Sequence, residues 1–191
     1  MKPTKNSSEH ETHKVINQSA PLKNYNLLTT DPILQNLLQS SQAEWGYELV
    51  QQLGQTLGTS EWIKKGFQVN EHTPKFNSHD TRGHRIDEVD FHPAYHELMQ
   101  LAFAYQIPTL PWRKEKHGAH KVRMALNYLY NQNEAGSACP LTMTFAAFPV
   151  LLKNPFTEHL QKQILNSKYD PSNKLLSQKE AATLGMAMTE K

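Results

Sequence analysis

Two histidines stand four residues apart, at His92 and His96, and Glu97 follows them directly. Residues at this spacing share one face of a helix, so the pair could supply two ligands to a metal ion. The zinc-protease pattern also needs a glutamate directly after the first histidine and a third ligand, and neither is evident here. The competing interpretation is that His92 caps a helix while His96 packs or hydrogen-bonds. We therefore assign no metal site.

Three further reactive side chains lie on one apolar stretch of the sequence. Cys139 could be a nucleophile at a helix N-terminus, but its neighbours Ala138 and Pro140 favour an inert, packed thiol. Thr142 and Thr144 follow it. Hydroxyl groups in a buried helix need hydrogen-bond partners, so each threonine either bonds back to a carbonyl one turn earlier or faces a ligand cavity. The residues alone leave both alternatives open.

A basic cluster precedes this stretch. Its members are Arg113, Lys114, Lys116, His117, His120, Lys121 and Arg123. Such a cluster could bind a phosphate-bearing ligand or nucleic acid. However, Glu115 interrupts it and no aromatic side chain is interleaved, which favours a solvated loop and helix face. The sequence also contains no P-loop, no dinucleotide glycine fingerprint and no nucleophile elbow, and we assign no catalytic residue.

Composition narrows the class of protein. The 191 residues suggest one domain, or one and a part, and the net charge of +2 argues against bulk electrostatic binding of nucleic acid. The single cysteine excludes an intrachain disulfide framework and is typical of a reducing compartment. The N-terminus lacks the apolar core of a secretory signal, and no segment is long and apolar enough to span a membrane. We expect a cytoplasmic protein with no membrane partner.

The stretch from Glu134 to Leu152 is the most apolar part of the chain. From Ser137 onward its only polar side chains are Ser137, Thr142 and Thr144. Because no polar stripe survives at helical spacing, we predict a helix that other helices cover on all sides. Ser137 is expected to cap its first turn. Pro149 removes a backbone hydrogen bond and is expected to kink or end the helix.

The remaining pattern predicts a mainly α fold, with a bundle-like helical domain. We expect a mostly extended arm over residues 1–30, the helical domain over 31–180, and a strand within 184–189 that opens a second unit at 181–191. Residues 70–91 read as a long surface connection with a short extended piece at 85–90. Helices are expected at 32–38, about 41–57, from Ser60, from Pro93, at about 119–131 and at about 155–165.

Two strings carry a family resemblance beyond these patterns. They run from Glu134 to Ala147 (EAGSACPLTMTFAA) and from Gly185 to Lys191 (GMAMTEK), and the string RIDEVDFHPAYHELM from Arg85 to Met99 agrees with them. Together they resemble the acyl-CoA dehydrogenase family, and more narrowly its DNA-alkylation-response (AidB-like) branch. The resemblance covers about residues 15–191.

The resemblance implies a fold and a function. Family members bind FAD and oxidise an acyl-CoA thioester between its α and β carbons. By the resemblance, Met188 and Thr189 would meet the flavin ring at the first strand of a β-domain, while Thr142 and Thr144 would line the acyl side of the cavity. The resemblance also implies a homo-oligomer, a tetramer in the family, and contact with DNA only through a C-terminal region that lies beyond this sequence.

Two hypotheses follow for the whole chain. In the first, it is the N-terminal fragment of an FAD-dependent acyl-CoA dehydrogenase-like flavoprotein, and the family's β-domain and catalytic glutamate lie beyond Lys191. Because a site shared between domains needs all its walls, this fragment alone is expected neither to hold FAD firmly nor to turn over substrate. In the second, the chain is a stand-alone helical interaction or binding module without enzymatic activity.

Overall fold

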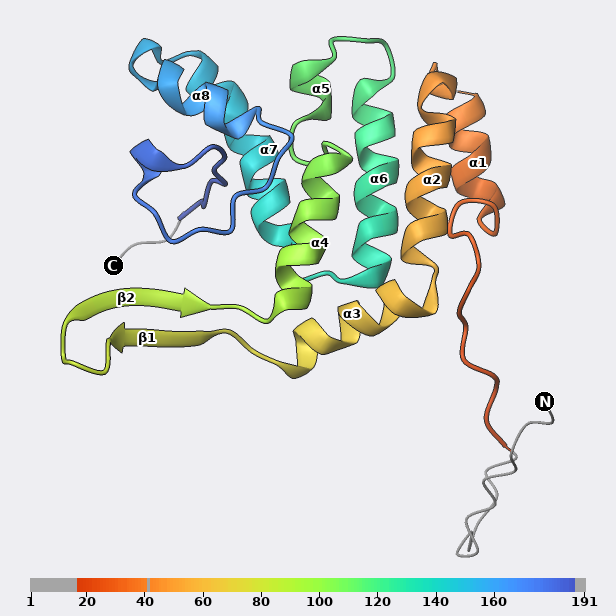
Figure 1. Ribbon diagram of the computed structural model, residues 1–191. Helices are drawn as coiled ribbons and strands as arrows, with labels where there is room; N and C mark the ends of the chain where they lie inside the picture. The colour runs from red at the N-terminus through yellow and green to blue at the C-terminus, as the bar shows by residue number, and fades with distance from the viewer. Residues whose placement is uncertain (1–16, 41, 188–191) are drawn as a thin grey trace, which may run out of the picture.

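The computed structural model describes residues 17–40 and 42–187, and the predicted mainly α fold is confirmed (Figure 1). The helices are α1 Pro32–Gln39, α2 Tyr47–Leu57, α3 Ser60–Glu71, α4 Pro93–Ala104, α5 Leu110–Arg113, α6 Ala119–Asn133, α7 Ala138–Leu152 and α8 Glu158–Ile164. Short 3-10 turns occupy Glu44–Gly46, Pro155–Thr157 and Leu176–Gln178, and the two strands are β1 Lys75–His79 and β2 Arg85–Asp90. Figure 1 shows α1, α2, α6 and α4 side by side, with α3 crossing below them.

Local chemistry explains where several helices begin. The Asp31 carboxylate accepts a hydrogen bond from the Leu34 amide at 2.9 Å, and Pro32 fills the first position of α1. The Nδ1 atom of His92 accepts from the Ala94 amide at 3.1 Å, so the predicted histidine cap of α4 is confirmed. The predicted cap of α3 is shifted by one residue, because Thr59 rather than Ser60 accepts from the first turn.

The core of the molecule is organised around α6. Seven of its residues are buried, and Val122, Leu126 and Leu129 have no exposed surface. The helix contacts α1, α2, α3, α5 and α7. Leu27 and Leu28, within the predicted N-terminal arm, also join this core. Apolar residues three or four positions apart, such as Val122, Leu126 and Leu129, therefore give α6 a buried face opposite a solvated one.

The prediction that the apolar stretch forms a fully covered helix is wrong. Four α7 side chains are buried, those of Ala138, Leu141, Thr144 and Phe148, whereas Val150 is 69% exposed and Leu152 is 54% exposed. Cys139 is also exposed, so its thiol is not packed as predicted. An apolar sequence pattern shows that the side chains disfavour water. Burial also requires neighbouring elements that pack against every side of the helix. Among the described residues, α5, α6, α8 and the segment after α8 cover only part of this helix.

Of the two outcomes expected at Pro149, an end of the helix is wrong, because α7 runs on to Leu152, while a kink there stays a prediction. Proline has no amide to donate to the Phe145 carbonyl one turn earlier. In the structure the indole Nε1 of Trp112 donates to that carbonyl at 3.1 Å, so the acceptor is satisfied from α5. Trp112 also stacks on the Phe145 ring at 5.2 Å between centroids. A side chain from a neighbouring helix thus replaces the missing backbone bond.

The start of α7 is also built differently from the prediction. Ser137 makes no capping hydrogen bond and instead shares one with the Tyr130 hydroxyl at 2.7 Å. The buried Glu134 carboxylate accepts from the backbone amides of Gly136 and Ser137 at 2.7 Å and 2.6 Å. Glu134 therefore satisfies the amides at this helix start and fixes the turn between α6 and α7.

The predicted surface connection over residues 70–91 contains an antiparallel hairpin of β1 and β2. Phe76 lies opposite Val89, and the Asp80 carboxylate holds the turn by accepting from the amides of Arg82 and His84. Every residue of both strands is exposed. In Figure 1 the hairpin extends away from the helices. Its faces lack the apolar and polar alternation of a half-buried strand, which is why the sequence indicated only a short extended piece.

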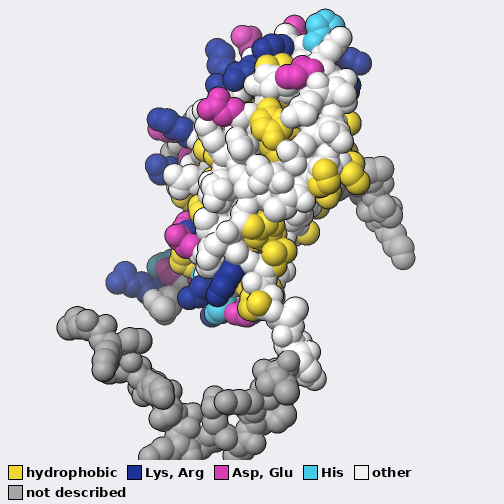
Figure 2. All heavy atoms as spheres, turned by 90° about the vertical axis from the view of Figure 1, so that its right-hand side faces the viewer, with side chains coloured by type: hydrophobic (Ala, Val, Ile, Leu, Met, Phe, Trp, Pro, Cys, Tyr) yellow, Lys and Arg dark blue, Asp and Glu magenta, His cyan; other side chains and the backbone are white. Residues whose placement is uncertain are grey.

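The face that carries α1 is rich in hydrophobic side chains. Helix α1 contains no charged residue, and its Ile33 is 81% exposed beside Leu37 and the α6 residues Met124 and Tyr128. Figure 2 shows such side chains as separate patches on this face, with charged groups near its edges. In the part of the chain that the structure describes, no helix is long and apolar enough to cross a membrane.

Candidate functional site

The first candidate feature is the contact between α7 and the C-terminal segment. The Thr144 hydroxyl donates to the Pro140 carbonyl at 2.7 Å and accepts from the Leu184 amide at 2.9 Å. The Met186 amide lies 3.2 Å from the Met143 sulfur. Two regions that are about forty residues apart in sequence are therefore held side by side, and the back-bonding alternative for Thr144 is confirmed.

The expected flavin-side residues follow directly after this segment. Residues 181–187 carry no strand pairing among the described residues, and Met188 and Thr189 lie outside them. The strand expected within 184–189 and the roles of those two residues thus stay predictions. What the structure does place is the chain that leads to them, which lies along α7.

Thr142 points to the surface, unlike Thr144. Its hydroxyl oxygen lies 3.4 Å from Nη2 of Arg123, a weak contact. The Arg123 side chain itself is buried: Nε donates to the Ile107 carbonyl at 3.0 Å and the guanidinium lies over the Phe145 ring at 4.1 Å. Burial lowers the pKa of Arg123 to about 10. Arg123 is therefore an exception to the predicted solvated basic cluster, whose other members are exposed.

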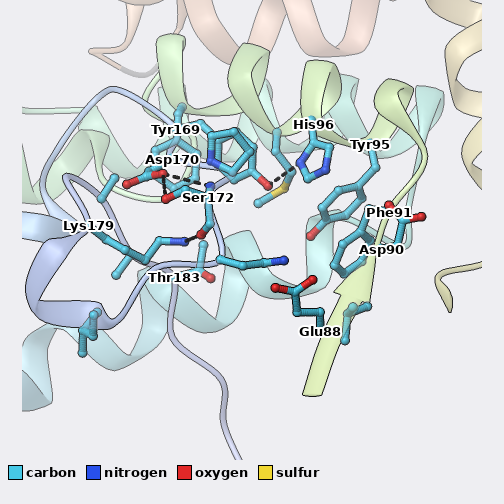
Figure 3. A pocket seen from close by; sticks show the side chains of 18 of the residues that line it. Glu88, Asp90, Phe91, Tyr95, His96, Tyr169, Asp170, Ser172, Lys179 and Thr183 are labelled. Carbon is cyan, nitrogen blue, oxygen red and sulfur yellow. Dashed lines mark hydrogen bonds between the residues drawn. The ribbon is translucent and has the colours of Figure 1, made fainter. Parts of the chain in front are cut away.

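The second candidate feature is a cavity of about 500 Å³. Four parts of the chain surround it: Asn77 of β1, the end of β2, helix α4, and the irregular segment 169–183 (Figure 3). Its lining includes Glu88, Asp90, Phe91, Tyr95, His96, Tyr169, Asp170, Lys179 and Thr183. Cavities of this size hold small molecules in many proteins. No sequence motif indicates this cavity, because its walls come together only through the fold.

Aromatic rings form one side of this cavity. Phe91 and Tyr95 stack with centroids 4.2 Å apart, and His96 meets both rings edge-on. The His96 Nδ1 lies 3.0 Å from the Tyr169 hydroxyl, which confirms the prediction that His96 packs or hydrogen-bonds. Burial raises the pKa of Tyr169 and lowers the pKa of His96, although Asp90 acts in the opposite direction on the histidine. The hydrogen bond therefore joins the imidazole and the phenol across the cavity wall, and the tautomer of His96 decides which of the two groups donates.

Polar groups close the opposite side. The Asp170 carboxylate accepts from the Ser172 hydroxyl at 2.6 Å and from the amides of Ser172 and Glu180. The hydrogen bond from the Ser172 hydroxyl is the main reason that the pKa of Asp170 falls to about 2. Lys179 Nζ donates to the Ser172 carbonyl at 2.6 Å. These bonds fold segment 169–183 over the cavity. Among the residues described, no three His, Cys, Asp or Glu side chains gather as a metal site would require.

Comparison with known proteins identifies the family of this chain. The sequence model of the family described as "Adaptive response protein AidB N-terminal domain" matches residues 17–171. This chain belongs to that family. The chain is also 39% identical over 185 residues to an Escherichia coli (strain K12) protein described as "Putative acyl-CoA dehydrogenase AidB". That alignment covers 95% of this chain and 34% of the relative, so the chain spans about a third of the length of that protein.

Two solved structures share the fold of this chain. A structure titled "Bd2924 apo-form" matches with a TM-score of 0.69 at 20% identity, covering 79% of this chain and 31% of the other. ACDH-11 of Caenorhabditis elegans, solved in complex with C11-CoA, matches with a TM-score of 0.67 at 20% identity, covering 87% of this chain and 30% of the other. The family model and the E. coli relative confirm the resemblance to the AidB-like branch, and the solved structures add that the fold is shared.

Proposed function

We propose that this AidB N-terminal domain forms the helical wall of a site for FAD and an acyl-CoA thioester in an acyl-CoA dehydrogenase-type flavoprotein. The 39% identity to the E. coli protein over 95% of this chain supports the proposal. The shared fold with ACDH-11, whose structure contains C11-CoA, is consistent with it.

The contact between Thr144 and Leu184 carries this proposal. It joins α7, the helix expected on the acyl side, to the segment that leads into Met188 and Thr189. We propose that Met188 and Thr189 approach the flavin through backbone groups and the Thr189 hydroxyl. Hydrogen bonds near the flavin nitrogens adjust the electron affinity of the ring, which is the control that a protein exerts over this cofactor.

The exposed side of α7 is suited to the acyl chain. Its Val150 and Leu152 side chains are largely accessible, and Thr142 faces the surface on the same helix. We propose that Thr142 and Thr144 mark the acyl side of the site. Thr144 acts by positioning, because its hydroxyl already has two partners. When bound, FAD would supply the electron-accepting chemistry, while this domain binds and orients the reactants.

The proposal assigns no other activity to this domain. No Asp or Glu among the described residues is assigned as the base that removes a substrate proton. We propose a homo-oligomeric assembly, as the family resemblance implies. We also propose that any DNA contact is made by residues outside this sequence, and the near balance of 20 basic and 18 acidic residues supports this.

A chimera tests the proposal directly. This chain replaces the matching third of the E. coli relative, and free flavin is removed before the absorbance of bound flavin is measured. We expect about one flavin per chain, and we expect addition of C11-CoA to change the flavin spectrum. The 191-residue chain alone should retain much less flavin, because one domain does not supply every wall of the site.

Two controls make the result decisive. The unaltered E. coli protein sets the reference occupancy, and circular dichroism establishes that the chimera is folded. A folded chimera without flavin would contradict the proposed function. So would stoichiometric flavin in the 191-residue chain, because it would mean that the site is complete without any further domain.

A further inference from the structure

The cavity between β2, α4 and segment 169–183 ends at Thr183, next to Leu184, but its lining includes neither Thr144 nor Leu184, whose contact carries the proposed function. We propose that this cavity binds an alkylammonium cation, either as a free small molecule or as the lysine side chain of another protein. The inference does not depend on the flavin role, since it rests on the walls, free polar groups and charge of the cavity.

The walls of the cavity combine aromatic ring faces with apolar side chains, and both suit an alkylammonium cation. Phe91 and Tyr95 form a stacked pair, and Tyr169 lies across from them beside His96, with 5.9 Å between the centroids of the Tyr169 and His96 rings. The faces of aromatic rings attract ammonium groups, and the attraction increases where water is excluded. Met99 and Phe103, both buried, add apolar lining. The alkyl part of a ligand can therefore be desolvated next to rings that also favour its charge.

Glu88 supplies the free anion. In Figure 3 its carboxylate points into the cavity, toward the Tyr95 hydroxyl. Within the described parts of the chain, the Glu88 carboxylate has no ion pair and no hydrogen bond, and the Tyr95 hydroxyl likewise has no hydrogen-bond partner. Asp170 differs, because its oxygens already accept three hydrogen bonds from Ser172 and Glu180. An ammonium donor could thus be shared between Glu88 and Tyr95 without displacing an existing contact.

The charge of the lining excludes the opposite class of ligand. The cavity contains the carboxylates of Glu88, Asp90 and Asp170 against the single ammonium of Lys179. Lys179 is directed to the Ser172 carbonyl, and burial disfavours protonation of His96. A phosphate or carboxylate would enter a site with excess negative charge and would lose solvation there. A cation gains from the same field.

The experiment uses an isosteric pair of probes with the 191-residue protein. Choline carries a trimethylammonium group, and 3,3-dimethylbutan-1-ol has the same shape without the charge. Binding is followed by NMR chemical-shift changes, which also locate the site. We expect choline to shift resonances of Tyr95, His96 and Tyr169 in a saturable way. The neutral alcohol should bind at least about tenfold more weakly, because it lacks the charge that Glu88 and the rings attract.

Matched hairpin variants identify the anion. Glu88→Gln should weaken choline binding about tenfold, because the quaternary ammonium loses the ionic attraction of the nearby carboxylate. Asp87→Asn is the control, because Asp87 is the next residue but its carboxylate is held by Arg85 Nε at 2.7 Å. Both side chains are exposed, so neither change should disturb the fold. An acetylated Gly-Lys-Gly amide separates the two sources: tighter binding of the peptide indicates a protein lysine, and tighter choline binding indicates a free small molecule.

Three results would overturn the inference. They are equal binding of choline and the neutral alcohol, equal loss of affinity in Glu88→Gln and Asp87→Asn, or no saturable shifts at Tyr95 and His96. None of these results bears on flavin occupancy of the chimera, so failure here is distinguishable from failure of the proposed flavin function.

Discussion

Helices α6 and α7 have fifteen residues each and lie next to each other, yet they are held in different ways. The less apolar helix, α6, buries seven side chains, whereas α7 buries four. The region around α6 is stabilised by apolar burial. The region after α7 is held largely by side chains that bond to backbone groups, such as Gln163 to the carbonyls of Leu176 and Lys179 and Asn166 to the carbonyl of Glu180.

The two helices show that the apolar content of a helix does not determine how many of its side chains are buried. The apolar face of α6 meets partners on several sides, so its pattern becomes core. The apolar surface of α7 exceeds what the surrounding described elements cover, and Val150 and Leu152 stay accessible. In our proposal this surplus serves a ligand rather than the stability of the domain. Substitutions in the core around α6 and in the region after α7 should therefore have different effects.

The largest effect is expected in the core around α6. Leu126→Ala should lower the free energy of unfolding by about 2–5 kcal/mol, because the side chain is fully buried and leaves a cavity. Leu152→Ala on α7 is the matched control and should change it by less than about 0.5 kcal/mol, since that side chain is 54% exposed. Urea denaturation measures both. Equal losses in the two variants would remove the contrast.

The junction between the two helices comes next. Glu134→Ala should cost about 1–3 kcal/mol, because the buried amide of Ser137 and the partly buried amide of Gly136 lose their acceptor. Glu134→Gln keeps one acceptor oxygen and should lose less. Thermal unfolding followed by circular dichroism compares the three proteins. Unchanged stability in Glu134→Ala would show that this carboxylate does not fix the start of α7.

A smaller effect is expected where α7 holds the C-terminal segment. Thr144→Val should cost about 1 kcal/mol and speed hydrogen exchange at the Leu184 amide, which loses its acceptor. Thr56→Val is the control, because the Thr56 hydroxyl makes the same one-turn bond to the Gln52 carbonyl and no described contact to a distant segment. If Leu184 exchanged at the same rate in the Thr144 variant, the segment would have to be held by something else.

The smallest effect concerns pH. The pKa of Asp170 falls from its ordinary value of 3.8 to about 2 in the folded protein, mainly through the Ser172 hydroxyl. A lowered carboxylate pKa gives stability that is present above pH 3.8 and is lost as pH falls toward 2. Carboxyl-carbon NMR should show this titration. The Asp170→Asn variant should lack that part of the acid dependence, and an Asp170 pKa at its ordinary value would contradict the folded-loop geometry.

Much of the fold could be predicted from local sequence signals. Asp31-Pro32 and His92-Pro93 mark helix starts. The four-residue spacing of Leu49, Leu53 and Leu57 indicates α2, but the helix expected from about residue 41 begins only at Tyr47, after a 3-10 turn. These signals act within one turn of helix, so tertiary contacts do not change them. The family resemblance extended the prediction to the level of the fold and was confirmed.

The remaining features depend on long-range contacts. No local pattern shows that Trp112 would satisfy the carbonyl left free by Pro149, or that Arg123 would be buried over Phe145. The cavity is a further case, because Glu88, Tyr95 and Tyr169 come from three parts of the chain. Its residues have no fixed spacing, so a sequence motif could not reveal them. The flavin-side residues Met188 and Thr189 rest on the resemblance alone.

The most direct test of the account measures flavin affinity in the chimera with and without the Thr144 contact. We expect Thr144→Val to weaken flavin binding several-fold, because the segment leading to Met188 and Thr189 loses its hydrogen bond to α7. Thr56→Val in the same chimera should leave the dissociation constant unchanged. A Thr144→Val chimera that binds flavin as tightly as its parent would contradict the claim that α7 positions the flavin-side segment.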